Sequence, residues 1–176
     1  MTNWLITNAE LVNEGRRLHA DLRVRDGRIA AIAPQLTART DERVLDAAGK
    51  LLLPGMIDDQ VHFREPGLEH KADFATESRA AVAGGITSFM EMPNSKPTTT
   101  TIDALHDKLA RAAVKSVANY AFYLGATNDN LDVIRNLDPR LACGIKIFMG
   151  ASTGNMLVDD PAVLDGIFRD APTIVV

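Results

Sequence analysis

The feature that most constrains this chain is an alternation of strand-like and helix-like segments that begins at residue 51. Apolar stretches typical of strands lie at 51–58, 86–92, 118–124 and 145–149, and a fifth begins at 173–176. Segments with helical spacing of apolar residues lie between them, at 72–83, 102–114, 131–137 and 161–168. Repeated units of strand, crossover helix and strand, each of roughly 30 residues, indicate a parallel α/β fold.

Such a fold closes in one of two ways, as an open doubly wound sheet or as a (β/α)8 barrel. No Gly-rich phosphate-binding loop follows the first strand, which disfavours a nucleotide-binding open sheet. Polar residues from His62 to Gly67 follow it instead, and barrel enzymes hold catalytic side chains at that end of a strand. A full barrel takes about 250 residues, so we expect the N-terminal part of a TIM-type barrel in an incomplete chain.

The first fifty residues have a different pattern, made of short strands and turns. Leu22–Arg25 alternates with period two, and Asp26-Gly27 is a hairpin turn that leads into the apolar segment Arg28–Ile32. The sequence therefore predicts a small antiparallel β-sandwich segment over residues 1–50. The truncated barrel is expected over residues 51–176.

Composition excludes several classes of function. The net charge is −4, which argues against a nucleic acid partner, because binding to phosphates requires clustered Lys and Arg. No apolar run approaches the ~20 residues that span a membrane, and the first residues do not resemble a signal peptide. Cys143 is the only cysteine, which fits a reducing compartment and a buried structural thiol. We expect a cytoplasmic protein.

Polar residues at the end of the first predicted strand are candidates for a site. Period-two geometry places Asp58, Gln60, His62 and Arg64 on one face. A polar face at the mouth of a barrel strand can hold a metal and a substrate together. A single histidine is also explained by an ordinary core or surface position, and the pattern by itself leaves both interpretations open.

Lys146 lies inside the apolar segment Gly144–Gly150, which is predicted to be a buried strand. A buried lysine is costly unless it is paired or modified. It is either part of an internal salt bridge or a neutral lysine that reacts with CO₂ to form a carbamate, an anion able to bridge two cations. Composition does not choose between the two.

Five motifs together resemble one known family. They are Pro-Gly-Met-Ile-Asp at 54–58, His-Phe-Arg-Glu-Pro-Gly at 62–67, Ala-Gly-Gly-Ile-Thr at 83–87, Met-Pro-Asn at 92–94, and the segment from Lys146 to Asn155. In this order they are similar to the dihydroorotases of the amidohydrolase superfamily, and the second and fourth mark its dihydroorotase and allantoinase branch. The resemblance covers essentially the whole chain, because the leading β unit is similar to the small N-terminal sandwich of that superfamily.

The resemblance implies a zinc-dependent hydrolase that interconverts (S)-dihydroorotate and N-carbamoyl-L-aspartate in pyrimidine synthesis. It implies one or two zinc ions, with His62 as the second histidine of a His-x-His metal pair. Arg64 and Asn94 match residues that bind the substrate carboxylate, a task suited to a guanidinium. Lys146 matches a position that is a carbamylated, metal-bridging lysine in many members of the superfamily.

One residue departs from the family pattern. Gln60 stands where the first histidine of the metal pair is expected, and an amide oxygen is a poorer zinc ligand than imidazole. The run Asp58–Gly67 is similar to a subgroup of bacterial dihydroorotases, so we interpret Gln60 as a branch variant of the metal site. The number of metal ions stays open.

The family pattern also places histidines on the fifth and sixth strands and an acid on the eighth, beyond Val176. No catalytic acid or base is therefore assigned within the chain, and we expect this polypeptide alone to be inactive and poorly stable. Two loops, Asn128–Asn130 and Ser152–Asn155, are secondary candidates for substrate contact.

Three alternatives to dihydroorotase remain. An allantoinase or a hydantoinase shares the scaffold and acts on a cyclic ureide. A non-catalytic dihydroorotase-like subunit that scaffolds aspartate transcarbamoylase would explain Gln60. An open-sheet nucleotide-binding module is the least favoured. A homo-oligomer is expected in the enzymatic cases.

Overall fold

The computed structural model describes residues 2–152 and 154–176. The chain divides into two compact units, Met1–Pro54 and Gly55–Val176. The boundary drawn from the sequence, between residues 50 and 51, falls earlier. Leu51 and Leu52 form a short strand, β5 (Leu51–Leu52), that pairs with the first strand of the chain and so belongs to the first unit.

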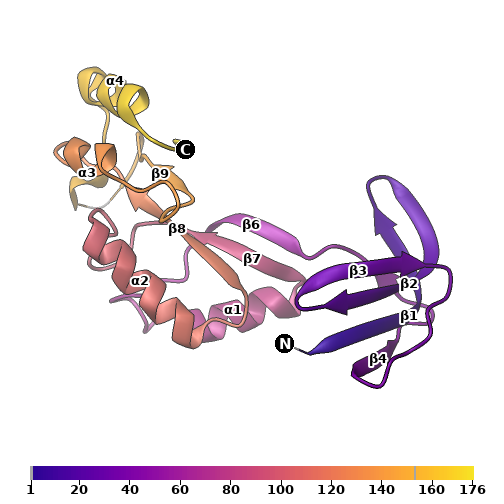
Figure 1. Ribbon diagram of the computed structural model, residues 1–176. Coiled ribbons are helices and arrows are strands. Elements are labelled where there is room, and N and C mark those ends of the chain that lie inside the picture. Colours follow the sequence, from indigo (N-terminus) through magenta and orange to yellow (C-terminus); the bar gives the residue numbers. More distant parts are fainter. Residues whose placement is uncertain (1, 153) are drawn as a thin grey trace. The chain divides into compact units, whose positions relative to one another are not determined.

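The first unit is a five-stranded sheet (Figure 1). Its strands run in the order β3-β2-β1-β4, with β5 also paired to β1. The bounds of the four longer strands are β1 (Asn3–Asn13), β2 (Arg16–Arg25), β3 (Arg28–Ala33) and β4 (Glu42–Asp46).

Two tight turns connect the first three strands. Glu14 and Gly15 have φ of 49° and 71°, and Asp26 and Gly27 have φ of 49° and 74°. Two-residue hairpin loops favour positive φ at both positions because such turns match the right-handed twist of the flanking strands. The hairpin predicted at Asp26-Gly27 is therefore confirmed.

The sheet of the first unit is mixed, which corrects the antiparallel sandwich expected from the sequence. The pairs β1–β2 and β2–β3 are antiparallel, but β4 and β5 both run parallel to β1. The segment after β3 takes the chain to the far side of β1, and β4 then runs in the same direction as β3 and β1. A second sheet facing this one is not seen among the described residues of the unit.

A buried carboxylate supports an irregularity in β1. The pairing of β1 with β2 shifts between Ile6 and Ala9, and Asn8 there has φ of 59°. Asp21 is buried, and it accepts hydrogen bonds from the backbone N–H of Asn8 at 2.9 Å and of Leu36 at 2.8 Å. The carboxylate thus satisfies one donor that the ladder leaves free, on Asn8, and one in the loop after β3, on Leu36.

The second unit contains four parallel strands with helices between them. The strands are β6 (Met56–Val61), β7 (Ile86–Glu91), β8 (Asn119–Gly125) and β9 (Gly144–Lys146), in the spatial order β6-β7-β8-β9. The helices are α1 (Phe74–Ala83), α2 (Ile102–Lys115), α3 (Leu131–Arg135) and α4 (Pro161–Asp170), and a 3₁₀ turn, η1, covers Gly154–Met156.

This order confirms the parallel α/β prediction for the second half of the chain. The strand predicted at 51–58 is the exception, because it is two strands, β5 and β6, in different sheets. The residues after α4 reach the free side of β9, where Val175 makes a parallel bridge with Ile145. That bridge is the start of the fifth strand expected at 173–176.

Helix ends follow the signals in the sequence. The side chain of Asp73 accepts from the backbone N–H of Thr76 and begins α1, while Gly84 and Gly85 end it, the latter with φ of 90°. Thr101 caps α2 and Asp160 caps α4 in the same way. Gly84 and Asp160 are thus the cap residues at the end of α1 and at the start of α4.

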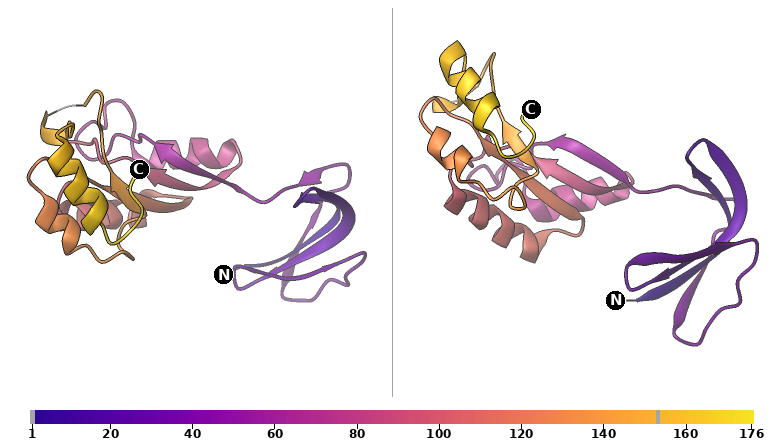
Figure 2. Two further views of the ribbon diagram at one scale, coloured as in Figure 1. Left: turned by 90° about the horizontal axis from the view of Figure 1, so that it is seen from above. Right: turned by 45° about the horizontal axis from the view of Figure 1, so that its top comes forward.

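The core of the second unit lies between the strands and the helices. Helix α1 packs on β7 and α2 on β8, on the same side of the strands (Figures 1 and 2). Alternate residues of each strand point into this layer, among them Phe89 on β7 and Phe122 and Leu124 on β8. No helix in the described part of the chain is long and apolar enough to cross a membrane.

Candidate functional site

The candidate site lies in the loops that follow the carboxyl ends of β6, β7 and β9. Parallel strands bring these loops to one edge of the sheet, as the sequence predicted. The first two loops are joined at their start, because the backbone N–H of Met92 donates to the carbonyl of Val61 at 3.0 Å. Residues that follow β6 and β7 are therefore held side by side.

His62 and Asn94 meet directly at this edge. The Nδ1 atom of His62 lies 2.8 Å from the Oδ1 atom of Asn94, and both side chains are partly buried. They are 32 residues apart in sequence. The structure thus brings together a residue predicted to bind metal and one predicted to bind substrate.

Arg64 has an unusual backbone conformation, with φ of 71°. A non-glycine residue in this left-handed region carries strain that the surrounding structure has to hold in place. The conformation ends the alternation predicted for Asp58 to Arg64, since β6 stops at Val61. Arg64 is therefore placed by its loop rather than by the face of the strand, which corrects the sequence-based picture.

The loop around Arg64 is locked against the loop after β7. The backbone N–H of Lys96 donates to the carbonyl of Pro66 at 2.9 Å, and that of Leu68 donates to the carbonyl of Arg64 at 3.1 Å. Gly67 has φ of 84°, and a Cβ atom there would lie 1.7 Å from the carbonyl oxygen of Lys96. Only glycine lets the backbone at residue 67 lie this close to Lys96, which explains on steric grounds why the Glu-Pro-Gly motif ends in glycine.

Glu65 ties the same loop to two helices. Its side chain is fully buried, and its carboxylate accepts from Nζ of Lys115 at 2.6 Å and from the backbone N–H of Phe74 at 3.1 Å. The hydrogen bond to Glu65 raises the pKa of Lys115. Sequence reasoning did not single out Glu65, although a carboxylate between Arg64 and Pro66 in a buried loop requires a partner.

A second buried ion pair lies beneath the end of β7. Nζ of Lys108 is 2.6 Å from Oε2 of Glu91, and it also donates to the carbonyl of Met92 at 3.1 Å. Burial raises the pKa of Glu91 and lowers that of Lys108, and their mutual attraction opposes both shifts. The pair was not identified from the sequence, because Lys108 stands on a helix that reads as an ordinary amphipathic one.

A cavity of about 510 Å³ opens beside Arg64 and Asn94. Three cationic side chains and several polar ones line it, namely Arg64, Lys71, Lys96, Asn94, Ser95 and Thr98, together with Leu68. No acidic residue is among those described as lining it. A concave surface with this charge favours an anionic ligand. Lys71 and Lys96 were not predicted as site residues.

Gln60 and Lys146 are less closely linked to this centre. The side chain of Gln60 is exposed on β6. Lys146 ends β9, and its Nζ lies 5.1 Å from the centre of the Phe148 ring, a cation–π arrangement. Lys146 is half-buried, and no ion pair of it occurs among the described residues. The internal salt bridge considered for it from the sequence is therefore not seen there.

The described residues do not by themselves form a metal site. Zinc sites use three or four protein ligands, and no group of three or more His, Cys, Asp or Glu side chains is assembled in residues 2–152 and 154–176. His62 supplies one imidazole.

Side-chain amides in the loops after β8 and β9 form a network with a carboxylate and backbone carbonyls. Asn155 donates to Asp129 at 3.0 Å, and Asn128 donates to the carbonyl of Leu157 at 2.9 Å. Asn130 is buried and donates to the carbonyls of Gly125 and Thr100, which supports a structural role for that residue. Thr153, within the predicted Ser152–Asn155 loop, lies outside the described residues.

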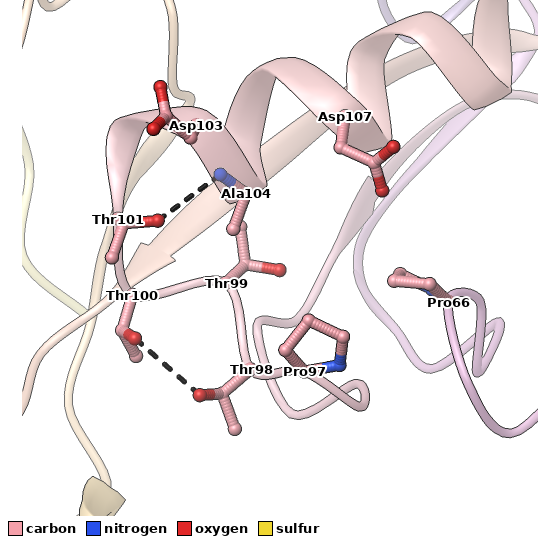
Figure 3. Close-up of a pocket in the computed structure, with 9 residues that line it drawn as sticks. All are labelled: Pro66, Pro97, Thr98, Thr99, Thr100, Thr101, Asp103, Ala104 and Asp107. Carbon is pink, nitrogen blue, oxygen red and sulfur yellow. Dashed lines mark hydrogen bonds between the residues drawn. The ribbon is translucent and has the colours of Figure 1, made fainter.

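Two further cavities lie nearby. One of about 330 Å³ is lined by Asn94, Phe148, Ala151 and Ser152, so Asn94 borders it as well as the cationic cavity. The other, of about 450 Å³, is formed by Pro66, Pro97, the threonines at 98–101 and the start of α2 (Figure 3). Its threonines bond to one another and cap the helix, and it contains none of the predicted site residues.

Known proteins match the chain over the same elements. The Dihydro-orotase-like family model matches residues 49–133. A dihydroorotase of Halobacterium salinarum is 41% identical over 86% of this chain and 34% of its own length. An allantoinase of Solibacter usitatus is 37% identical over 86% of this chain and 33% of its own length.

A solved structure agrees with these matches. The L-hydantoinase (dihydropyrimidinase) of Arthrobacter aurescens has a TM-score of 0.87 and 33% identity, over 96% of this chain and 38% of that one. These matches support the cyclic amidohydrolase family for this chain. It corresponds to the N-terminal portion of these proteins and spans about a third of the length of the curated relatives it matches.

Proposed function

We propose that this chain forms part of a dihydroorotase, which reversibly hydrolyses (S)-dihydroorotate to N-carbamoyl-L-aspartate. The observation that carries the proposal is the cationic cavity beside Arg64 and Asn94. Dihydroorotate bears a carboxylate on its ring, whereas the hydantoin and allantoin rings bear none. A binding site built for a carboxylate therefore favours the first substrate among the cyclic amides of this family.

Arg64 is the residue that we expect to bind the carboxylate. Its guanidinium offers parallel N–H donors that match the two oxygens. Asn94 borders the same cavity and adds an amide, while Lys71 and Lys96 raise the positive potential at its rim. Together they select a small anionic substrate and fix its orientation.

We propose zinc as the cofactor, as one or two ions, with His62 as a ligand. Bound zinc would lower the pKa of water and polarise the ring carbonyl. Gln60 and Lys146 are the further candidates, the latter as a carbamate. An exposed amide at Gln60 is a weak zinc ligand, so a single ion with Gln60 uninvolved is the simpler arrangement.

A hydantoinase is the second candidate, supported by the match to the L-hydantoinase structure. It is separated from a dihydroorotase by a panel of substrates, since only one of the two requires the carboxylate. An allantoinase is tested by the same panel.

A non-catalytic subunit that scaffolds aspartate transcarbamoylase is the remaining alternative, and Gln60 favours it. It predicts a stable hetero-complex and no bound metal. The catalytic form is proposed as a cytoplasmic homo-oligomer.

The test uses the full-length product of the source gene, with the 176-residue chain as a separate sample. Turnover of dihydroorotate, together with bound zinc in the same preparation, is the expected result. Turnover of a hydantoin or allantoin with no activity on dihydroorotate would move the assignment to that enzyme. A folded, metal-free protein without turnover on any of the three would favour the scaffolding subunit.

A further inference from the structure

The contact between Nδ1 of His62 and Oδ1 of Asn94 links the orientation of the amide to the position of the proton on the histidine ring. An amide oxygen only accepts hydrogen bonds. Since Nδ1 of His62 faces Oδ1 of Asn94 at 2.8 Å, the bond forms only if Nδ1 carries hydrogen. In the neutral ring the other nitrogen, Nε2, then keeps its lone pair.

We propose that Asn94 is a positioning residue that holds His62 in its Nδ1–H tautomer. Neutral imidazole in water prefers hydrogen on Nε2, so the contact selects the less common form. In this tautomer Nε2 of His62 keeps its lone pair and is free to coordinate a cation or to accept a proton. This role goes beyond binding the substrate carboxylate, and it does not depend on which substrate the protein uses.

Backbone hydrogen bonds next to both residues hold His62 and Asn94 close to one another. His62 directly follows Val61, whose carbonyl accepts from the backbone N–H of Met92, and Asn94 lies two residues beyond Met92. Nζ of Lys108 donates a hydrogen bond to the carbonyl of Met92 at 3.1 Å. Both partners are therefore fixed within a few residues of the same strand pairing.

The Nδ2 group of the Asn94 amide stays available as a hydrogen-bond donor in this arrangement. Within the described part of the chain, Nδ2 of Asn94 donates to no protein group, and the residue borders the cationic cavity. The oxygen of the amide thus serves the histidine while the nitrogen stays available as a donor. The reverse orientation, with Nδ2 donating to Nδ1, would require hydrogen on Nε2 and is the arrangement that the experiment has to exclude.

The tautomer is read by ¹H–¹⁵N NMR through the two-bond couplings of the imidazole ring, on the ¹⁵N-labelled full-length protein after removal of bound metal with a chelator. His62 is identified by loss of its signals in His62→Gln. We expect a protonated Nδ1 and an unprotonated Nε2 in the unaltered protein. Asn94→Ala removes the acceptor, and there the hydrogen should move largely to Nε2.

Asn94→Asp is the matched control, because a carboxylate keeps the acceptor at the same position. Nδ1 should stay protonated in that variant, while the signals of His70 and His106, both exposed, should not change in either one. Hydrogen on Nε2 in the unaltered protein overturns the proposal, even if Asn94→Ala fails to fold. A folded Asn94→Ala variant that keeps Nδ1–H would also overturn it. Neither result bears on the proposed dihydroorotase activity.

Discussion

Glu91 and Lys108 form an ion pair of 2.6 Å in the interior of the second unit, with both side chains almost fully buried. Glu91 ends β7 and Lys108 lies on α2, so the pair joins the sheet to the helix directly below the Met-Pro-Asn segment. Lys108 also binds the carbonyl of Met92. The pair therefore supports the segment that presents Asn94.

Lys108→Met should lower the free energy of unfolding by about 3–5 kcal/mol at neutral pH, because it leaves Glu91 buried and uncompensated. The double variant Lys108→Met with Glu91→Gln should recover much of that loss, since no unpaired charge remains. Urea unfolding of the two single variants and the double variant measures the coupling. If the loss of unfolding free energy in the double variant equals the sum of the losses in the two single variants, the pair is not coupled.

The stability of the Lys108→Met variant should depend on pH, and the pKa shift of Glu91 gives the sign of that dependence. Burial holds the pKa of Glu91 above its ordinary 4.5, and removing Lys108 removes the attraction that opposes this shift. Above pH 4.5 the unfolded chain loses that proton while the folded protein keeps it, so stability falls as pH rises through the window up to the folded pKa. Lys108→Met should thus be more stable near pH 5 than near pH 8 relative to the unaltered chain. Urea midpoints at the two pH values test this, and an opposite trend would contradict it.

Gly67→Ala should strongly destabilise the loop that carries Arg64. A Cβ atom at residue 67 would lie 1.7 Å from the carbonyl oxygen of Lys96, and the backbone there has φ of 84°. Gly85→Ala is the matched control in the same unit, because φ is 90° and the nearest atom, the flexible Met56 side chain, lies at 3.9 Å. In the control variant the free energy of unfolding should fall by only about 1 kcal/mol, because alanine is unfavourable at this positive φ. Equal thermal stabilities of the two variants would refute the steric argument.

Arg64→Lys should weaken the binding of N-carbamoyl-L-aspartate about tenfold or more, because lysine cannot replace a two-pronged contact worth roughly 1.5–3 kcal/mol. Calorimetric titration of the full-length protein measures the effect. Arg79→Lys is the control, since Arg79 is exposed on α1 and binds only the carbonyl of Ala75 among the described groups. If both variants bind equally well, Arg64 does not hold the carboxylate.

Cys143 should react slowly with alkylating reagents at neutral pH. Burial raises the pKa of its thiol from the ordinary 9.0 to about 11, so the folded protein holds about 100-fold less thiolate than the unfolded chain. The rate of reaction with iodoacetamide should therefore keep rising with pH until close to 11, and denaturant should accelerate it at pH 8. A fast reaction in the native protein at pH 8 would show that the thiol is accessible and activated.

The sequence by itself determined much of this protein. The alternation of strands and helices, the caps at Asp160 and Gly84-Gly85, and the hairpin at Asp26-Gly27 are local features, set by periodicity and by residues with particular backbone preferences. The motifs around His62 and Asn94 also indicated the family before any geometry was known.

Other features were decided only by the tertiary structure. The parallel pairing of β4 with β1 depends on the path of a crossover, which local propensity does not encode. Arg64 does not lie on the face of β6, because hydrogen bonds in the adjoining loops hold its backbone at positive φ. The ion pairs of Glu65 with Lys115 and of Glu91 with Lys108 join residues far apart in the chain. Their partners are selected by burial, which forces each charge to find a counterpart, and burial exists only once the chain has folded.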